Sequence, residues 1–223
     1  MKIEAVIFDM DGTIVDSIGI WKKMNKLYLD KKGVEYEGEI YPELKSGNAI
    51  QQGAAYFKRR FGLKETIEEI IDEWTAMMLP FYREFKPKPY VRDFLEYLSQ
   101  NSIKTAIATS NSKTMADEFL SSKKLNDYFD VVVGGMSVKR GKPFADIFVK
   151  AAKLVCIKPS KCVVIEDSLS GIDAARNAGM RVFLIKDDYQ DFDKLKHLVD
   201  YAALDYLQIM EKFKQLQKTS VNS

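Results

Sequence analysis

The sequence predicts an α/β protein in which a parallel β-sheet, covered by helices on both faces, carries a helical domain inserted after the first strand. Short apolar segments alternate with longer amphipathic segments, as strands alternate with helices in a parallel sheet. The short segments are apolar on both faces, which is typical of strands that are covered on both sides. One long interval near the N-terminus, in contrast, contains only helical patterns.

Five short segments rich in valine and isoleucine are the predicted strands. They are residues 3–8, 103–108, 129–133, 162–165 and 182–185. Amphipathic helices are predicted to connect the later strands. They cover residues 91–100, 113–121, 144–155 and 170–178. Gly179 follows the last of these helices, where a residue at positive φ closes a helix at low cost.

The interval after the first strand is predicted to form a separate helical bundle. Helical patterns run through residues 21–29, 49–61 and 67–79. At 223 residues the chain has room for one or two domains. We therefore expect an α/β domain of residues 1–16 and 84–215, an inserted helical domain of residues 17–83, and a polar, frayed tail of residues 216–223.

The composition excludes several classes of protein. With 46% apolar and 30% charged residues, the chain is typical of globular proteins. A formal net charge of +2 gives no reason to expect nucleic acid or an anionic membrane as a partner. No apolar run approaches the ~18–20 residues that span a bilayer. The first residues are too charged for a signal peptide, and two cysteines cannot build a disulfide framework, so we expect a cytoplasmic protein.

Pairs of acidic residues end two of the predicted strands. Asp9 and Asp11 follow the first strand, and Glu166 and Asp167 end the fourth. Buried carboxylates are costly unless something binds them. Helix capping is the alternative explanation, but it accounts for one acid of a pair more easily than for both.

Polar residues also follow the other two strands of this part of the sheet. Thr109, Ser110 and Asn111 come after the second strand, and Lys142 comes after the third. Taken alone, the first group is typical of a helix start and the second of a surface lysine. Because the carboxyl ends of parallel strands meet at one edge of a sheet, where ligands bind, we expect these residues and the four acids to lie together.

The charges at that edge predict a metal ion. Four acids and one lysine leave three net negative charges, which a divalent cation reduces to one. Carboxylate oxygens as ligands favour Mg²⁺, which keeps several water molecules and accepts phosphate as a further ligand. A calcium-binding loop of the EF-hand type is not expected, because Ile14 stands where such a loop needs glycine.

The order and spacing of these motifs resemble the haloacid dehalogenase superfamily. The resemblance covers the predicted sheet domain, and the helical insertion resembles the small cap domain of that family. It rests on the motifs Asp9-Met10-Asp11-Gly12-Thr13, Thr109, Gly141-Lys142-Pro143 and Glu166-Asp167-Ser168, the last followed by Gly171. The later two motifs look like the branch of β-phosphoglucomutases and sugar phosphatases. The resemblance implies a Rossmann-like core with a helical-bundle cap that determines substrate specificity.

The resemblance also implies a role for each motif residue. Asp9 would be the nucleophile that forms an aspartyl-phosphate, and Asp11 would act as general acid and then as general base. Thr109, Ser110 and Asn111 would bind the phosphoryl group, and Lys142 would balance the charge between Asp9 and phosphate. Mg²⁺ would be bound by Asp9, by the backbone carbonyl of Asp11 and by Asp167, with Glu166 as a ligand or as a partner of the ligands.

Within the superfamily, the residue identities favour a phosphatase. The dehalogenases of the family lack the second aspartate, so Asp11 indicates a phosphate ester with an alcohol as the leaving group. The β-phosphoglucomutases carry a histidine in the first cap helix, where this chain has Trp21, and an arginine in the specificity loop, which is absent here. A mutase stays the alternative, and a non-catalytic phosphate-sensing or interaction module is an alternative of another class.

The substrate is expected to be a small phosphorylated metabolite such as a sugar or polyol phosphate. Such a molecule fits a site closed by a cap better than a protein or a nucleic acid does. The cap candidates for contact with the leaving group are Trp21, Lys45, Gly47 and Asn48. The chain is expected to be a monomer, with a weak dimer as the alternative.

Overall fold

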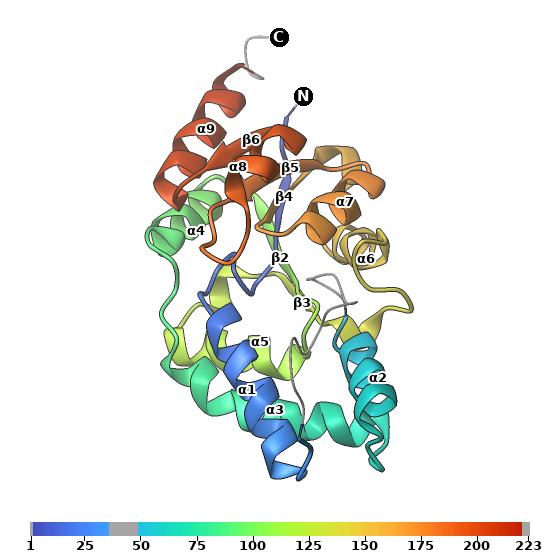
Figure 1. Ribbon diagram of the computed structural model, residues 1–223. Helices are drawn as coiled ribbons and strands as arrows, with labels where there is room; N and C mark the ends of the chain where they lie inside the picture. Colours follow the sequence, from blue (N-terminus) through green and yellow to red (C-terminus); the bar gives the residue numbers. More distant parts are fainter. Residues whose placement is uncertain (1, 36–48, 220–223) are drawn as a thin grey trace.

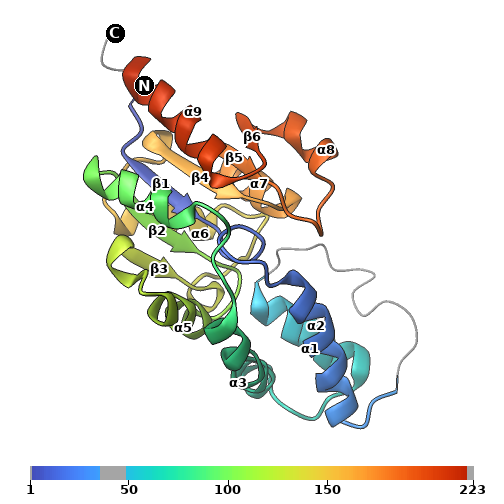
Figure 2. The same cartoon turned by 90° about the vertical axis from the view of Figure 1, so that its left-hand side faces the viewer.

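Six parallel strands form one sheet in the computed structural model, which describes residues 2–35 and 49–219. The strand order is β3-β2-β1-β4-β5-β6 (Figure 1, and Figure 2, where β1 is labelled). The strands are β1 (Ala5–Phe8), β2 (Lys104–Ala108), β3 (Val131–Val133), β4 (Cys162–Glu166), β5 (Arg181–Ile185) and β6 (Tyr201–Ala203). Phe8, at the end of β1, lies beside Ile107 of β2 and Ile165 of β4, so these strands end level with one another. Their carboxyl ends therefore share one edge of the sheet.

Nine α-helices are found among the described residues. They are α1 (Ile18–Lys31), α2 (Ile50–Phe61), α3 (Ile67–Glu84), α4 (Val91–Gln100), α5 (Lys113–Lys123), α6 (Asp146–Leu154), α7 (Leu169–Asn177), α8 (Phe192–Leu195) and α9 (Tyr206–Thr219). Four short 3-10 helices lie at Asn126–Tyr128, Gly135–Ser137, Pro159–Lys161 and Lys196–Leu198. In the part of the chain that the structure describes, no helix is both long and apolar enough to cross a membrane.

Alternating residues of the strands divide the core of the sheet domain into two layers. On β1, Val6 and Phe8 face the layer that contains α4, α5 and α9. Ala5 and Ile7 face the opposite layer, which contains α6 and α7. Every residue of β1 is buried, as expected for a central strand that is covered on both faces.

Helices α1, α2 and α3 form a bundle beyond the carboxyl ends of the strands (Figure 2). Its interior is aromatic: the Trp74 ring lies edge-on to Tyr28 at 5.8 Å and to Phe57 at 4.9 Å. Two chain segments join the bundle to the sheet domain, one after β1 and one after α3, and their backbones are hydrogen-bonded to each other. The backbone N–H of Lys88 donates to Ile14 over 2.7 Å.

The five predicted strands are all present, but a sixth was missed. β6 has three residues, Tyr-Ala-Ala, of which Ala203 alone is buried, so it lacks the valine- and isoleucine-rich pattern of the others. β3 is shorter than predicted, because Phe129 and Asp130 precede its ladder.

Each predicted helix is present, with ends that differ from the prediction in all but α4, and α9 was not predicted. α3 continues to Glu84, five residues beyond the predicted end, and α1 starts three residues before its predicted start. The polar tail was expected from residue 216, but α9 runs to Thr219. Leu216 packs against the core and the Gln217 side chain donates to the Ile3 carbonyl over 2.9 Å, so this turn of the helix is anchored.

Candidate active site

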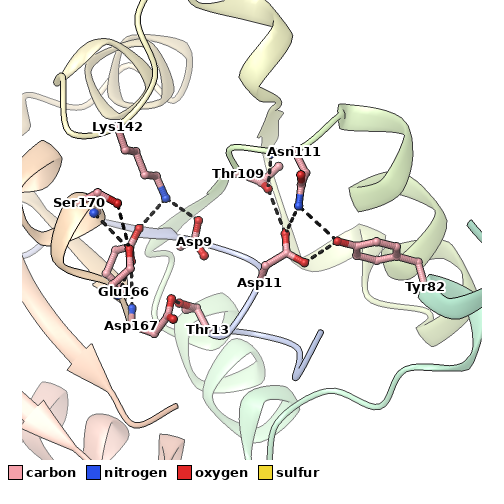
Figure 3. Close-up of polar contacts among 12 residues, drawn as sticks. Asp9, Asp11, Thr13, Tyr82, Thr109, Asn111, Lys142, Glu166, Asp167 and Ser170 are labelled. Atoms are coloured by element: carbon pink, nitrogen blue, oxygen red, sulfur yellow. Dashed lines mark hydrogen bonds and ion pairs between the residues drawn. The ribbon is translucent and has the colours of Figure 1, made fainter. Parts of the chain in front are cut away.

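The ends of three neighbouring strands bring the predicted residues together (Figure 3). Asp9 follows β1, Thr109 follows β2, and Glu166 ends β4 with Asp167 after it. The backbone N–H of Asp9 donates to Ile165 over 2.9 Å, so the β1–β4 pairing continues to the nucleophile candidate itself. The expected convergence at one sheet edge is therefore what the structure shows.

Lys142 links two of these acids. Its side chain is 2% exposed, and its ammonium group forms ion pairs with Oδ1 of Asp9 and, over 2.5 Å, with Oε1 of Glu166. Burial by itself lowers the pKa of Lys142, but the charges of Asp9 and Glu166 outweigh it and raise the pKa above its usual value. Lys142 is therefore a permanent positive charge beside the end of β1, and it is not a surface lysine.

Glu166 is fixed by the start of α7. Its Oε2 accepts hydrogen bonds from the backbone N–H groups of Asp167 over 2.9 Å and Ser168 over 3.0 Å, and from the Ser168 hydroxyl over 3.0 Å. A Cβ atom at Gly171 would lie 1.8 Å from Oε1 of Glu166. Together with the Lys142 ion pair, these contacts use both carboxylate oxygens, which favours a supporting role for Glu166 over that of a primary metal ligand.

Asp167 lies against the turn that follows β1. Its Oδ1 accepts a hydrogen bond from the Thr13 hydroxyl over 3.1 Å. Gly12 adopts a φ of +86°, and a Cβ atom there would lie 2.3 Å from Oδ2 of Asp167. The turn can approach the carboxylate this closely only because residue 12 has no side chain.

Three of the acids form a cluster that could hold a metal ion. Asp9, Glu166 and Asp167 each offer a carboxylate oxygen, and these oxygens lie within 4.8 Å of one another. Burial raises the pKa of Asp9 to about 8, against the opposing effect of Lys142, and raises the pKa of Asp167 well above its usual value. The ligands are buried carboxylate oxygens, and a divalent cation would neutralise the negative charge of their ionised forms. Both features fit Mg²⁺.

The Asp11 carboxylate is directed away from this cluster, toward the cap. Its Oδ1 accepts from the Ser17 hydroxyl over 2.5 Å. Oδ1 also accepts from the Tyr82 hydroxyl, and Oδ2 accepts from the Asn111 amide over 2.7 Å (Figure 3). In this arrangement the Asp11 carboxylate is therefore not a candidate metal ligand. The backbone carbonyl of Asp11, which the resemblance assigns as a ligand, stays a prediction. Burial and the Asp11 charge raise the pKa of Tyr82 well above its usual value, so the phenol stays protonated.

The polar residues after β2 lie between the sheet edge and the cap. Thr109 is fully buried, and its hydroxyl lies 3.5 Å from Oδ2 of Asp11 and accepts from the Asn111 backbone over 3.1 Å. The Ser110 carbonyl accepts from the backbone N–H of Ile50, the first residue of α2, over 2.9 Å. This stretch therefore contacts both the general-acid candidate and the cap.

The cap candidates are placed only in part. Trp21 is half-buried in α1, and its indole N–H donates to the Tyr82 hydroxyl over 3.2 Å. Its contact with a leaving group stays a prediction. Lys45, Gly47 and Asn48 lie outside the residues that the structure describes.

Sequence reasoning missed the contacts of Tyr82 and Ser17. Tyr82 is one of 11 tyrosines in the chain, and nothing in its neighbourhood distinguishes it from a core residue of an amphipathic helix. Ser17, six residues after Asp11, could have been singled out by its place at the start of the first cap helix.

Comparisons with known proteins agree with this geometry. A family model described as haloacid dehalogenase-like hydrolase matches residues 6–185. A phosphorylated carbohydrates phosphatase of Thermotoga maritima is 32% identical over 179 residues, which are 80% of this chain and 82% of the relative. A fructose-1-phosphate phosphatase of Escherichia coli is 29% identical over 80% of this chain and 94% of its own length.

Solved structures share the fold. The crystal structure of CbbY from Rhodobacter sphaeroides in complex with phosphate superimposes with a TM-score of 0.82 at 24% identity, over 92% of this chain and 95% of that one. At this identity, the similarity is evidence for the α/β sheet and the helical cap, and not for a substrate. The sequence match over most of the chain carries the assignment: this chain belongs to the haloacid dehalogenase-like hydrolase family.

Proposed function

We propose that this protein is a Mg²⁺-dependent phosphatase that hydrolyses the phosphate ester of a sugar or a similar small metabolite through an aspartyl-phosphate on Asp9. The family and the names of its relatives support a phosphatase of phosphorylated sugars or related metabolites. The single observation that carries the mechanism is the buried group in which Lys142 pairs with Asp9 beside Glu166 and Asp167.

In the first step, an oxygen of Asp9 attacks phosphorus and the bond to the ester oxygen breaks. A carboxylate that approaches a phosphate charge meets a repulsion of about 4 kcal/mol per unit pair at 4 Å and an effective dielectric of about 20. The Lys142 ammonium offsets this repulsion, because it already contacts the attacking carboxylate. The stretch of Thr109, Ser110 and Asn111 after β2 would bind the phosphoryl oxygens.

Asp11 handles the protons of both steps. As a carboxylic acid it gives a proton to the departing ester oxygen, so that an alcohol leaves in place of an alkoxide, which is typically worth about 10²–10⁴-fold. As a carboxylate it then takes a proton from the water that attacks phosphorus, which releases phosphate and restores Asp9. Its position on the cap side of the site favours this role, because the leaving group lies opposite the nucleophile in an in-line displacement.

Asp9, Asp167 and the backbone carbonyl of Asp11 would hold Mg²⁺, and Glu166 would support them. When bound, the ion supplies positive charge that offsets the charge of the phosphoryl oxygens. A cytoplasmic location and a monomeric state stay predictions from the sequence.

A phosphate-release assay tests the proposal. We expect release from one or more hexose, pentose or polyol phosphates, with loss of activity in EDTA and recovery with added Mg²⁺. Asp9→Asn should abolish release, because the amide cannot act as the nucleophile, whereas Asp93→Asn, an exposed acid on α4, should leave it unchanged.

Two results would contradict the proposal. Interconversion of sugar phosphate isomers faster than phosphate release would indicate the mutase alternative. Phosphate-induced thermal stabilisation without turnover would indicate a non-catalytic phosphate-binding module.

A further inference from the structure

The carboxylate of Asp11 is held by donors from both domains. Four side chains donate to it: Ser17 and Tyr82 to Oδ1, and Asn111 and, at 3.5 Å, Thr109 to Oδ2. Asn111 and Thr109 belong to the sheet edge, and Tyr82 belongs to the cap helix α3. The sheet domain alone therefore does not fix the position of the Asp11 carboxylate, because the Tyr82 hydrogen bond comes from the cap.

The hydrogen-bond partners of the Tyr82 hydroxyl determine the direction in which it donates its proton. The Tyr82 oxygen accepts from the indole N–H of Trp21 over 3.2 Å and from the Asn111 amide over 3.4 Å. A phenolic hydroxyl has one proton and at most two acceptor positions. Since two donors already point at this oxygen, its proton is directed to Asp11, and the indole N–H reinforces that hydrogen bond.

Tyr82 is also anchored in place. Its side chain is fully buried, and its ring lies edge-on to Phe85 at 5.4 Å. The same end of α3 is tied to α5 of the sheet domain by the ion pair between Arg83 and Glu118 at 2.5 Å. The Lys123 ammonium donates to the Arg83 carbonyl as well. Helix α3, which holds the phenol beside Asp11, is therefore bound both within the cap and to the sheet domain.

We propose that Tyr82 is a positioning residue for the general acid: its hydroxyl, oriented by Trp21, holds the Asp11 carboxyl on the cap side of the site, where the ester oxygen departs. The inference rests on the proposed function, because it assumes that Asp11 protonates the leaving group. Tyr82 itself touches neither the nucleophile nor the acid cluster in Figure 3.

The arrangement has a consequence for substrate class. Help from Asp11 matters most when the leaving alcohol is a poor leaving group, as it is for sugar and polyol phosphates. It matters little for an aryl phosphate, whose phenolate leaves without a proton. Loss of the Tyr82 hydroxyl should therefore slow alkyl phosphates selectively, whereas general damage to the fold would slow both kinds of substrate alike.

The test compares Tyr82→Phe with the wild-type enzyme on two substrates: the best hexose phosphate of the panel above and p-nitrophenyl phosphate. We expect kcat/KM to fall by about tenfold on the hexose phosphate and by less than about twofold on the aryl ester, as for the loss of one hydrogen bond to a charged group. Trp21→Phe should give a smaller loss with the same selectivity, because the hydroxyl remains but is less well oriented.

Tyr28→Phe is the matched control. Tyr28 is a fully buried cap tyrosine that packs on Trp74, and its hydroxyl has no hydrogen-bond partner in the part of the chain that the structure describes. Its removal should leave the ratio of the two kcat/KM values at the wild-type level. An unchanged melting temperature of Tyr82→Phe would confirm that the variant is folded.

Asp11→Asn separates failure of the inference from failure of the proposed function. If Asp11→Asn loses more activity on the hexose phosphate than on the aryl ester but Tyr82→Phe does not, the positioning role of Tyr82 is wrong and the general-acid role of Asp11 stands. If Asp11→Asn loses activity equally on both, the acid role is wrong, and the inference is overturned with it.

Discussion

Gly12 brings the backbone of the turn after β1 against the Asp167 carboxylate. Its φ of +86° lies in the left-handed region, and the nearest atom to a Cβ there would be Oδ2 of Asp167 at 2.3 Å. Two separate demands therefore meet at one residue: a backbone conformation that favours glycine, and space for a carboxylate. Gly62, between α2 and α3, has a similar φ of +64° but nothing within 4 Å of its Cβ position.

Gly62 serves as a matched control for Gly12, because the two share a backbone conformation but only Gly12 lies against a carboxylate. Gly62→Ala should cost roughly 1–2 kcal/mol of stability, the usual penalty of a left-handed residue, and leave kcat/KM unchanged. Gly12→Ala should cost at least as much and should also displace Asp167, so we expect about a hundredfold loss of phosphatase activity and a weaker response to Mg²⁺. Urea unfolding and phosphate release measure both variants. Equal activity of the two alanine variants would contradict the importance of this close approach.

At the same scale, the sequence predicts the acids but not the residues that orient them. Asp9 and Glu166 stand out because a carboxylate at the end of an apolar strand is unusual. Tyr82 meets Asp11 across 71 positions of sequence, and that contact depends on how α3 lies against α5. No local sequence pattern predicts this contact, because Tyr82 also fits the pattern of its helix and Asp11 that of its turn.

Among the elements, the strands were the most predictable. Central strands covered on both faces must be apolar throughout, and β1 and β4 are fully buried. β6 lies at the edge of the sheet and has a single buried residue, so that requirement does not apply to it. α3 continues five residues beyond its predicted end and includes Pro80, and Met78 and Tyr82 of its last turns are packed in the core.

The start of α3 offers a test of how far stability and activity can be separated. Thr66 accepts from the backbone N–H of Glu69 over 3.1 Å, and the Glu69 carboxylate accepts from the Thr66 N–H over 2.7 Å. Thr66→Ala removes half of this capping box and should lower the free energy of unfolding by about 1 kcal/mol, whereas Thr66→Ser should retain it.

We expect kcat/KM of Thr66→Ala to stay at the wild-type value, because Tyr82 lies at the opposite end of the helix and is anchored there through α5. Denaturant unfolding and the hexose phosphate assay give the two readouts. A selective loss on the hexose phosphate would show instead that the position of Tyr82 depends on the whole length of α3.

For the whole molecule, the buried acids make stability depend on pH and on metal. Burial raises the pKa of Asp9 to about 8 and that of Asp167 well above its usual value near 4. The folded protein therefore binds these protons more tightly than the unfolded chain. In the absence of metal, the resulting stabilisation is fully present below about pH 4 and is lost as the pH rises toward about 8.

Mg²⁺ should reverse this trend, because the ion binds the ionised carboxylates and competes with their protons. We expect the rise in melting temperature caused by Mg²⁺ to be small at about pH 5.5 and to grow toward about pH 8. Asp167→Asn should abolish the response at every pH. It should also raise the melting temperature of the metal-free protein at about pH 8, since it removes a buried charge while Thr13 can still donate to the amide oxygen. A Mg²⁺-induced rise that is the same at both pH values, or larger at the lower one, would mean that the ion binds elsewhere than at the carboxylates that end β1 and β4.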